Sequence, residues 1–125
     1  MTDIRTTKQI GDQGEDLACK FLEKKGFEIL KRNYLIRGGE LDIIAMDGET
    51  LVFVEVKTRY NTEFGYAREA VTPWKLRYLK KVATYYMMET NWHDKSCRID
   101  LVAIDYPEGN PDGQPAIELI QNITQ

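Results

Sequence analysis

The sequence predicts an α/β domain with a mixed central β-sheet flanked by helices. Two segments have the apolar period of amphipathic helices, and short hydrophobic segments with strand-like patterns lie between and after them. The predicted order is α-β-β-β-α-β-β. The chain has 125 residues, of which 42% are hydrophobic, which is enough for one compact domain with a core.

Residues 9–25 form the first predicted helix, and Gly26 ends it. Its apolar face consists of Ile10, Gly14, Leu17, Ala18, Phe21 and Leu22. Glu15 lies on the flank of this face, so it is the acid of the helix best placed to approach the sheet. Taken alone, a solvated helix glutamate is the more common interpretation.

Three predicted strands follow, at 27–34, 39–45 and 51–59. We expect the turn of the second hairpin at Asp47-Gly48, because Asp-Gly favours a two-residue loop. That loop would place Asp42 diagonal to Glu55, whereas a four-residue loop would place the two directly opposite each other. Both loops put Asp42 and Glu55 on the strand face that also carries Lys57.

The second predicted helix begins at Thr72-Pro73, a capping threonine followed by proline at the first helical position, and runs to about Glu89. Lys75, in its first turn, borders the core face. Two more strands are predicted at 96–105 and 116–123, the last at the sheet edge, with a turn-rich loop between them. We expect one domain over residues 1–125, with 1–8 and 106–125 peripheral.

No part of the sequence predicts a membrane protein or a disulfide framework. No segment approaches the length of a transmembrane span, and the N-terminus lacks the apolar stretch of a signal peptide. Cys19 and Cys97 are too few and too far apart to indicate a disulfide framework or a zinc site. We therefore expect a cytoplasmic protein with no membrane partner.

Charge is unevenly distributed along the chain. The net charge of −3 argues against a protein that coats nucleic acid indiscriminately. Residues 57–81, however, contain seven basic residues against two acidic ones. The candidates for phosphate binding are Arg59, Lys75, Arg77, Lys80 and Lys81. A solvated helix surface is the alternative. Four aromatic residues among these cations are available either to stack on bases or to pack, namely Tyr60, Tyr66, Trp74 and Tyr78.

The carboxylates of the hairpin predict a metal site. Glu40 joins Asp42 and Glu55 on the same face. At an effective dielectric of about 20, two like charges about 4 Å apart repel by roughly 4 kcal/mol, so a compensating cation is expected. Mg²⁺ or Mn²⁺ suits such a site, because these ions bind carboxylate oxygens and keep waters for a substrate phosphate. The alternative is an ordinary solvated sheet face.

Ordered motifs along the chain resemble the YraN-type family of small bacterial proteins. They are Gly14-Glu15, Asn33-Tyr34, residues 39–45 and 52–59, Phe64-Gly65, Ala70-Val71, Lys75 and Arg98-Ile99-Asp100. That family is similar to the PD-(D/E)XK nuclease superfamily, which has the restriction-endonuclease-like fold, and its nearest likeness is to archaeal Holliday junction resolvases. The resemblance extends to about Ile104.

The resemblance implies a Mg²⁺- or Mn²⁺-dependent endonuclease acting on DNA, with branched or structured DNA as a candidate substrate. Asp42, Glu55 and the backbone carbonyl of Val56 would be metal ligands, Glu15 would assist them, and Lys57 would be the lysine of the D-E-x-K constellation. The proline of the superfamily name is absent, because Leu41 precedes Asp42.

A domain of this size has no separate recognition module, so specificity would need a homodimer or a partner protein. The alternative function is a noncatalytic nucleic-acid-binding or adaptor protein on the same scaffold.

Overall fold

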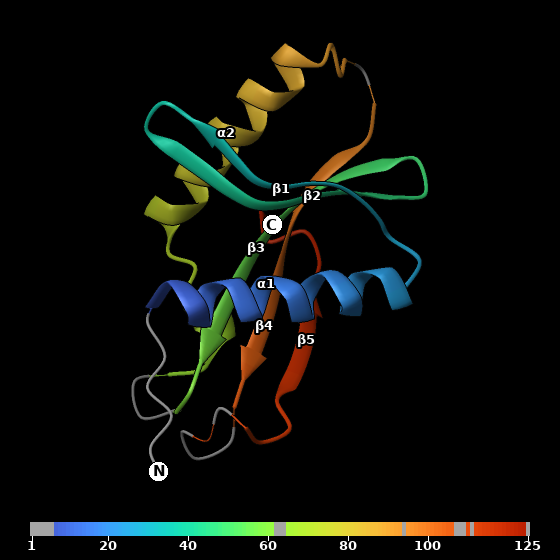
Figure 1. Ribbon diagram of the computed structural model, residues 1–125. Coiled ribbons are helices and arrows are strands. Elements are labelled where there is room, and N and C mark those ends of the chain that lie inside the picture. Colours follow the sequence, from blue (N-terminus) through green and yellow to red (C-terminus); the bar gives the residue numbers. More distant parts are fainter. Residues whose placement is uncertain (1–6, 62–64, 94, 107–109, 111, 125) are drawn as a thin grey trace.

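Helices cover both faces of a twisted sheet (Figure 1). The computed structural model describes residues 7–61, 65–93, 95–106, 110 and 112–124. Phe64 of the predicted Phe64-Gly65 motif, residues 1–6 and most of the 107–113 loop lie outside this range. The elements are α1 (Thr7–Lys24), β1 (Glu28–Ile36), β2 (Gly39–Asp47), β3 (Thr50–Arg59), the 3₁₀ helix η1 (Ala67–Glu69), α2 (Pro73–Glu89), β4 (Cys97–Asp105) and β5 (Ala116–Ile120).

The sheet is mixed, with strand order β1-β2-β3-β4-β5 among the described residues. β3 and β4 are parallel because α2 crosses over between them, and each of the other neighbouring pairs is antiparallel. This arrangement confirms the predicted restriction-endonuclease-like class and the order α-β-β-β-α-β-β. The short helix η1 was not predicted.

Strand β3 is buried on both faces. Val52 and Val54 pack in the hydrophobic cluster under α1, whereas Leu51 and Phe53 pack in the cluster under α2. β4 is covered in the same way, which agrees with its nearly continuous apolar sequence. The backbone of β3 is therefore fixed from both sides up to Glu55.

Helix α1 approaches β3 closely at Gly14. A Cβ atom at this position would lie 2.5 Å from Thr58 Oγ1, so a larger residue would fit only if the Thr58 side chain, the helix or the strand shifted. The close approach places the next residue, Glu15, against the sheet, where only 8% of it is exposed.

The side chains of β1 change the face of the sheet toward which they point at Asn33, which has a φ of +52°. Before it, Arg32 reaches Asp16 on α1, and after it, Tyr34 packs in the cluster under α2. The partner strand makes the same change, because Ile43 packs under α1 and Leu41 under α2. Asp42 therefore lies where β2 passes from one face of the sheet to the other.

The turn of the β2–β3 hairpin differs from the prediction. Asp47 pairs with Thr50, so the loop is Gly48-Glu49 and not Asp47-Gly48. Gly48 has a φ of +62°, as the first central position of a type II′ turn requires. The register ends at Ile43↔Val54, and its continuation sets Asp42 opposite Glu55. The diagonal placement was therefore wrong, because the observed register excludes a pair between Asp42 and Phe53; the four-residue loop is not formed either.

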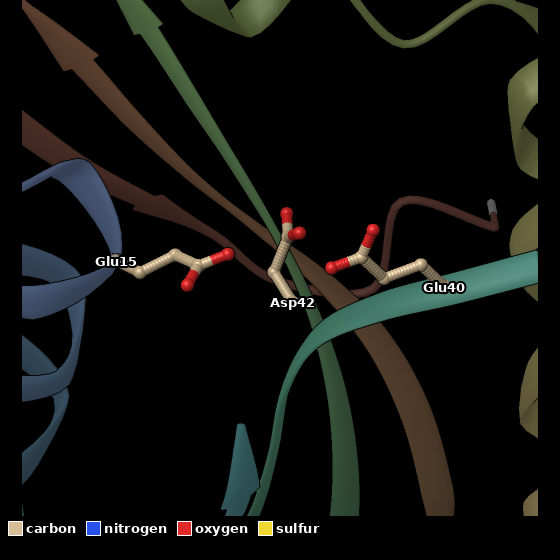
Figure 2. Close-up of side chains that lie close together, drawn as sticks. All are labelled: Glu15, Glu40 and Asp42. Carbon is tan, nitrogen blue, oxygen red and sulfur yellow. The ribbon is translucent and has the colours of Figure 1, made fainter. Parts of the chain in front are cut away.

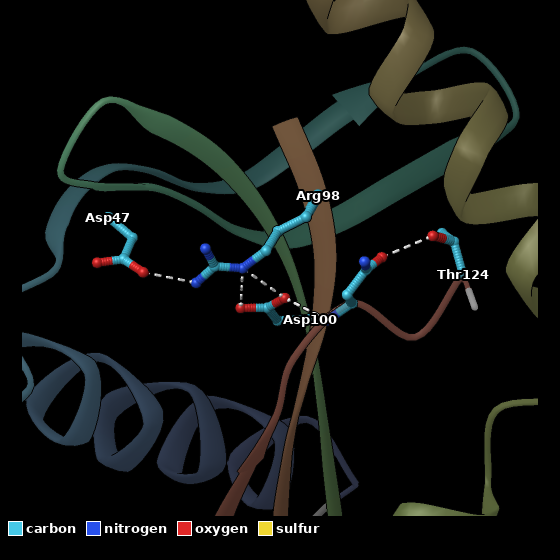
Figure 3. Close-up of polar contacts among 5 residues, drawn as sticks. Asp47, Arg98, Asp100 and Thr124 are labelled. Carbon is cyan, nitrogen blue, oxygen red and sulfur yellow. Dashed lines mark hydrogen bonds and ion pairs between the residues drawn. The ribbon is translucent and has the colours of Figure 1, made fainter. Parts of the chain in front are cut away.

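Arg98 links the hairpin turn to the C-terminal segment (Figure 3). Its Nε atom donates to both carboxylate oxygens of Asp100 at 3.0 Å, and its Nη2 atom lies 2.7 Å from Asp47 Oδ2. Asp100 is completely buried and also accepts from the backbone N–H of Asn122 at 2.9 Å. Asn122 has a φ of +53°, so the chain turns there, and β5 ends at Ile120 rather than at the predicted residue 123.

We predict that Arg98→Leu lowers the free energy of unfolding by about 3 kcal/mol, because it leaves Asp100 buried without its cation. Asp47→Ala removes only the more exposed partner and should cost less than about 1 kcal/mol. Urea denaturation of both variants beside the wild type measures the difference. Equal losses in the two variants would show that the buried pair does not hold this part of the fold.

Candidate functional site

Three carboxylates from α1 and β2 converge on one point (Figure 2). Oxygen atoms of Glu15, Glu40 and Asp42 all lie within 4.8 Å of one another. Glu15 comes from the helix, and Asp42 lies between it and Glu40. Glu15 is buried, Asp42 is partly buried and Glu40 is exposed, so the cluster extends from the protein interior to the surface.

The site forms where β2 and β3 stop pairing. Beyond Ile43↔Val54 the register between these strands ends, and the backbone N–H of Val56 donates to Asp42 Oδ2 at 2.8 Å. A side chain thus takes the place of a strand carbonyl as acceptor. This substitution satisfies the backbone donor of β3 and holds the Asp42 carboxylate at the point where the strands separate.

Glu55 adds a fourth carboxylate, from β3. It is 8% exposed, and its Oε2 atom lies 3.1 Å from Lys75 Nζ at the start of α2. A hydrogen bond and charge repulsion between Glu55 and Asp42 contribute to the pKa of Asp42. Glu55 therefore joins the cluster of Asp42 to the positive charge on α2.

Burial, together with the hydrogen bond and negative charge of Glu55, raises the pKa of Asp42 to about 9, although the Val56 N–H acts in the opposite direction. Burial also raises the pKa of Glu15 above its ordinary value, against the opposing charge of Arg32. The cluster consequently holds at least one proton at neutral pH when no cation other than those of the chain is bound.

The donor atoms suit a hard divalent cation. Glu15 Oε2 is buried and accepts no hydrogen bond from the described residues, and the guanidinium of Arg32 remains 3.6 Å away. This ion pair with Arg32 offsets part of the cost of burying the oxygen. Glu15, Glu40 and Asp42 line a pocket of about 550 Å³ between α1, β1 and β2. Carboxylate oxygens are the ligands that Mg²⁺ and Mn²⁺ prefer.

The other predicted residues lie at various distances from this cluster. Lys57 is partly exposed, and strand alternation puts it on the same side of β3 as Glu55. It makes no ion pair with the described part of the chain. Arg59 has a buried Nε atom without a hydrogen-bond partner among the described residues. The remaining predicted cations, Arg77, Lys80 and Lys81, are exposed on α2, and no contact joins them to the described carboxylates.

One feature of the site was not predicted: Glu40 was placed on the right face but not among the metal ligands. Lys75 was expected to border the core face, and its contact with Glu55 agrees with that position, while its binding to nucleic acid stays a prediction. Asn33, of the Asn33-Tyr34 motif, lines the pocket beside Glu15 at the position where the strand changes face. The asparagine itself is a signal in the sequence, because asparagine adopts positive φ more readily than most other residues.

Residues 14–104 match the uncharacterised protein family UPF0102. The chain belongs to this family. It is the YraN-type family that the motifs predicted, and the match includes the whole carboxylate cluster and Lys75. No helix among the described residues is both long enough and apolar enough to cross a bilayer.

Several members of the family are similar to this chain over most of their length. A UPF0102 protein of Geotalea daltonii is 45% identical over 92% of this chain and 88% of its own length. Another, from Caldicellulosiruptor saccharolyticus, is 46% identical over 78% of this chain and 82% of its own. A third, from Symbiobacterium thermophilum, is 42% identical over 93% of this chain and 96% of its own.

The raised pKa of Asp42 predicts how stability depends on pH in metal-free buffer. The unfolded carboxyl titrates at about 4. Between that pH and the folded pKa of about 9, the folded protein holds a proton that the unfolded chain has lost. The free energy of unfolding therefore falls as pH rises through this range. The free energy of unfolding of Asp42→Asn, whose side chain cannot ionise, should fall less as pH rises. At about pH 8 it should exceed that of the wild type.

Urea denaturation across a pH series, with a chelator present, tests this expectation. Glu23→Gln is the matched control, because it removes an exposed carboxylate of α1 far from the cluster in the sequence and should keep the wild-type slope. If Asp42→Asn and Glu23→Gln gave parallel curves, the proton on Asp42 would have no part in the pH dependence.

Proposed function

We propose that this chain is a Mg²⁺- or Mn²⁺-dependent endonuclease that hydrolyses phosphodiester bonds in DNA, including branched or structured DNA. The observation that carries the proposal is the meeting of Glu15, Glu40 and Asp42, joined through Asp42 to Glu55, with the Arg32 guanidinium 3.6 Å from the buried Glu15 Oε2 atom and Lys75 at Glu55 as the chain's own cations beside them. Four carboxylates this close together favour the binding of a further cation.

The proposed ligands come from three elements. Asp42 and Glu55 supply carboxylates from the two strands, Glu15 supplies one from α1, and the resemblance adds the backbone carbonyl of Val56. Glu40 completes the set on the exposed side. When bound, the ion supplies positive charge for the phosphate oxygens and favours the deprotonation of water.

The residues of the chain have separate parts in this reaction. Lys57 shares a strand face with Glu55. We propose that it either stabilises the negative charge that develops on the phosphate or orients the attacking water. Lys75 offsets the charge of Glu55 at 3.1 Å. Val56 holds Asp42 in place through its backbone N–H.

The proposed substrate surface consists of the cations that follow the site in the sequence. It contains Arg59, Lys75, Arg77, Lys80 and Lys81, which would bind phosphates without reading sequence. A symmetric homodimer would present two sites to the two strands of a duplex or junction. A protein acting on DNA in a bacterium would work in the cytoplasm.

Cleavage of labelled duplex, single-stranded, flap and four-way-junction DNA with Mg²⁺ or Mn²⁺ tests the proposal. We expect Asp42→Asn and Lys57→Met each to reduce the cleavage rate by at least about 100-fold, since the first weakens the proposed metal site and the second removes a positive charge beside the reacting phosphate. Lys20→Met is the matched control, because Lys20 is an exposed lysine of α1, and it should cleave at the wild-type rate.

Activity that survives a chelator, or that persists in Asp42→Asn, would contradict the proposal. Wild-type protein that binds these DNAs and cleaves none of them under either metal would favour the noncatalytic binding protein instead.

A further inference from the structure

A large exposed aromatic side chain stands at the beginning of α2. Trp74 is 66% exposed in the first turn of the helix. Its ring stacks on that of Tyr78, with the centroids 6.0 Å apart and the planes 15° from parallel. Tyr78 therefore supports the indole from one side and leaves most of it open to solvent.

Tyr78 connects this tryptophan to the carboxylate site through two contacts. The backbone N–H of Glu40 donates to the Tyr78 hydroxyl oxygen at 2.6 Å. Lys75 Nζ lies 4.6 Å from the centroid of the Tyr78 ring and 3.1 Å from Glu55 Oε2. The Tyr78 ring thus links Trp74 to Glu40, and the same ring together with Lys75 links it to Glu55.

The other aromatic residues of the basic segment have different surroundings. Tyr60 stacks on Tyr106 at 4.8 Å and packs against the core under α1, which makes it a packing residue. Tyr66 is half exposed, with Arg68 over its ring at 5.9 Å, and no contact links it to the described carboxylates. Among the aromatic residues of this segment that the structure describes, Trp74 alone combines an open ring with a connection to the site.

Nucleobases are the ligands that fit such a ring beside a phosphate-cleaving site. Every base has a flat face that stacks on an aromatic side chain without regard to sequence. In a duplex those faces are covered by neighbouring bases, so only an unpaired or extruded base can reach the indole. Lys75 places a positive charge for the backbone next to the same rings.

We propose that Trp74 stacks on an unpaired base, and that the substrates are nucleic acids with a single-stranded nucleotide next to the cleaved phosphate. This inference rests on the proposed nuclease function and adds the substrate class to it. Blunt, fully paired duplex would then bind without using Trp74.

Intrinsic fluorescence gives a direct test, because the chain has two tryptophans. The second, Trp92, is partly buried against the core under α2, and Trp92→Phe leaves Trp74 as the only reporter. This protein would be titrated, with Ca²⁺ in place of Mg²⁺, with single-stranded DNA, RNA of the same sequence and blunt duplex DNA. Anisotropy of labelled oligonucleotides would measure binding in parallel.

Single-stranded DNA should quench Trp74, and blunt duplex should not. Trp74→Ala should weaken single-strand binding by roughly 5- to 100-fold, and Trp74→Phe should restore most of it. Tyr85→Ala is the control, since Tyr85 is a 54% exposed aromatic on the same helix, and it should bind like the wild type. Equal quenching by RNA supports stacking without sugar recognition, and quenching by DNA alone supports stacking with it.

Binding of single-stranded DNA without quenching, or with unchanged affinity in Trp74→Ala, would overturn the stacking inference and leave the cleavage proposal standing. Absence of binding to every nucleic acid by the wild type would overturn both.

Discussion

The burial of β3 on both faces is the constraint on which the site depends. Apolar clusters under α1 and α2 fix this strand, and Gly14 lets α1 approach it so closely that Glu15 reaches the carboxylates of β2 and β3. Packing therefore holds carboxylates of like charge close together, where they repel each other and lose part of the hydration that each would have in water. The protein offsets part of this cost with a proton on Asp42 and with Lys75 beside Glu55. A divalent cation would offset it more completely, because one ion can bind oxygens of several carboxylates together.

The second requirement is an interruption in the sheet. A regular β2–β3 ladder would cover the backbone of β3 and leave no room between the strands. Here the positive φ of Asn33 turns the outer hairpin from one face of the sheet to the other, and Asp42 lies at the crossing point. Its side chain then replaces the missing strand partner of Val56. The irregularity thus lets Glu40 and Asp42 line one pocket with Glu15, and Glu55 lies beside Asp42, while the adjoining residues remain in the core. Irregular strand geometry at functional sites is common for this reason.

Local patterns predicted the elements well and their register less well. Apolar periodicity, the Thr72-Pro73 cap and the apolar run of β4 each depend on neighbouring residues, and the helices and strands they predicted are present. The hairpin turn was placed one residue early because Asp-Gly is a strong local signal, whereas Asp47 is held in the strand by Arg98, 51 residues later in the chain. Helix periodicity placed Lys75 at the border of the core face, but its partner Glu55 and the bond from the Glu40 N–H to Tyr78 depend on distant segments, so the pattern did not identify them. Motif resemblance brought Glu15, Asp42 and Glu55 together. Strand alternation placed Glu40 on the face of Asp42, and the structure adds it to the candidate ligands because one of its oxygens lies within 4.8 Å of oxygens of Glu15 and Asp42.

Calorimetric titration with Mn²⁺ at about pH 8, in two buffers with different ionisation enthalpies, tests the metal site most directly, because it needs no substrate. If the carboxylates form a metal centre, wild-type protein binds Mn²⁺ and releases protons, since the cation replaces the proton on Asp42, and Asp42→Asn binds far more weakly with no proton release. Wild-type protein that binds no Mn²⁺, or binding with equal affinity in Asp42→Asn, would contradict the assignment of this cluster as a metal centre.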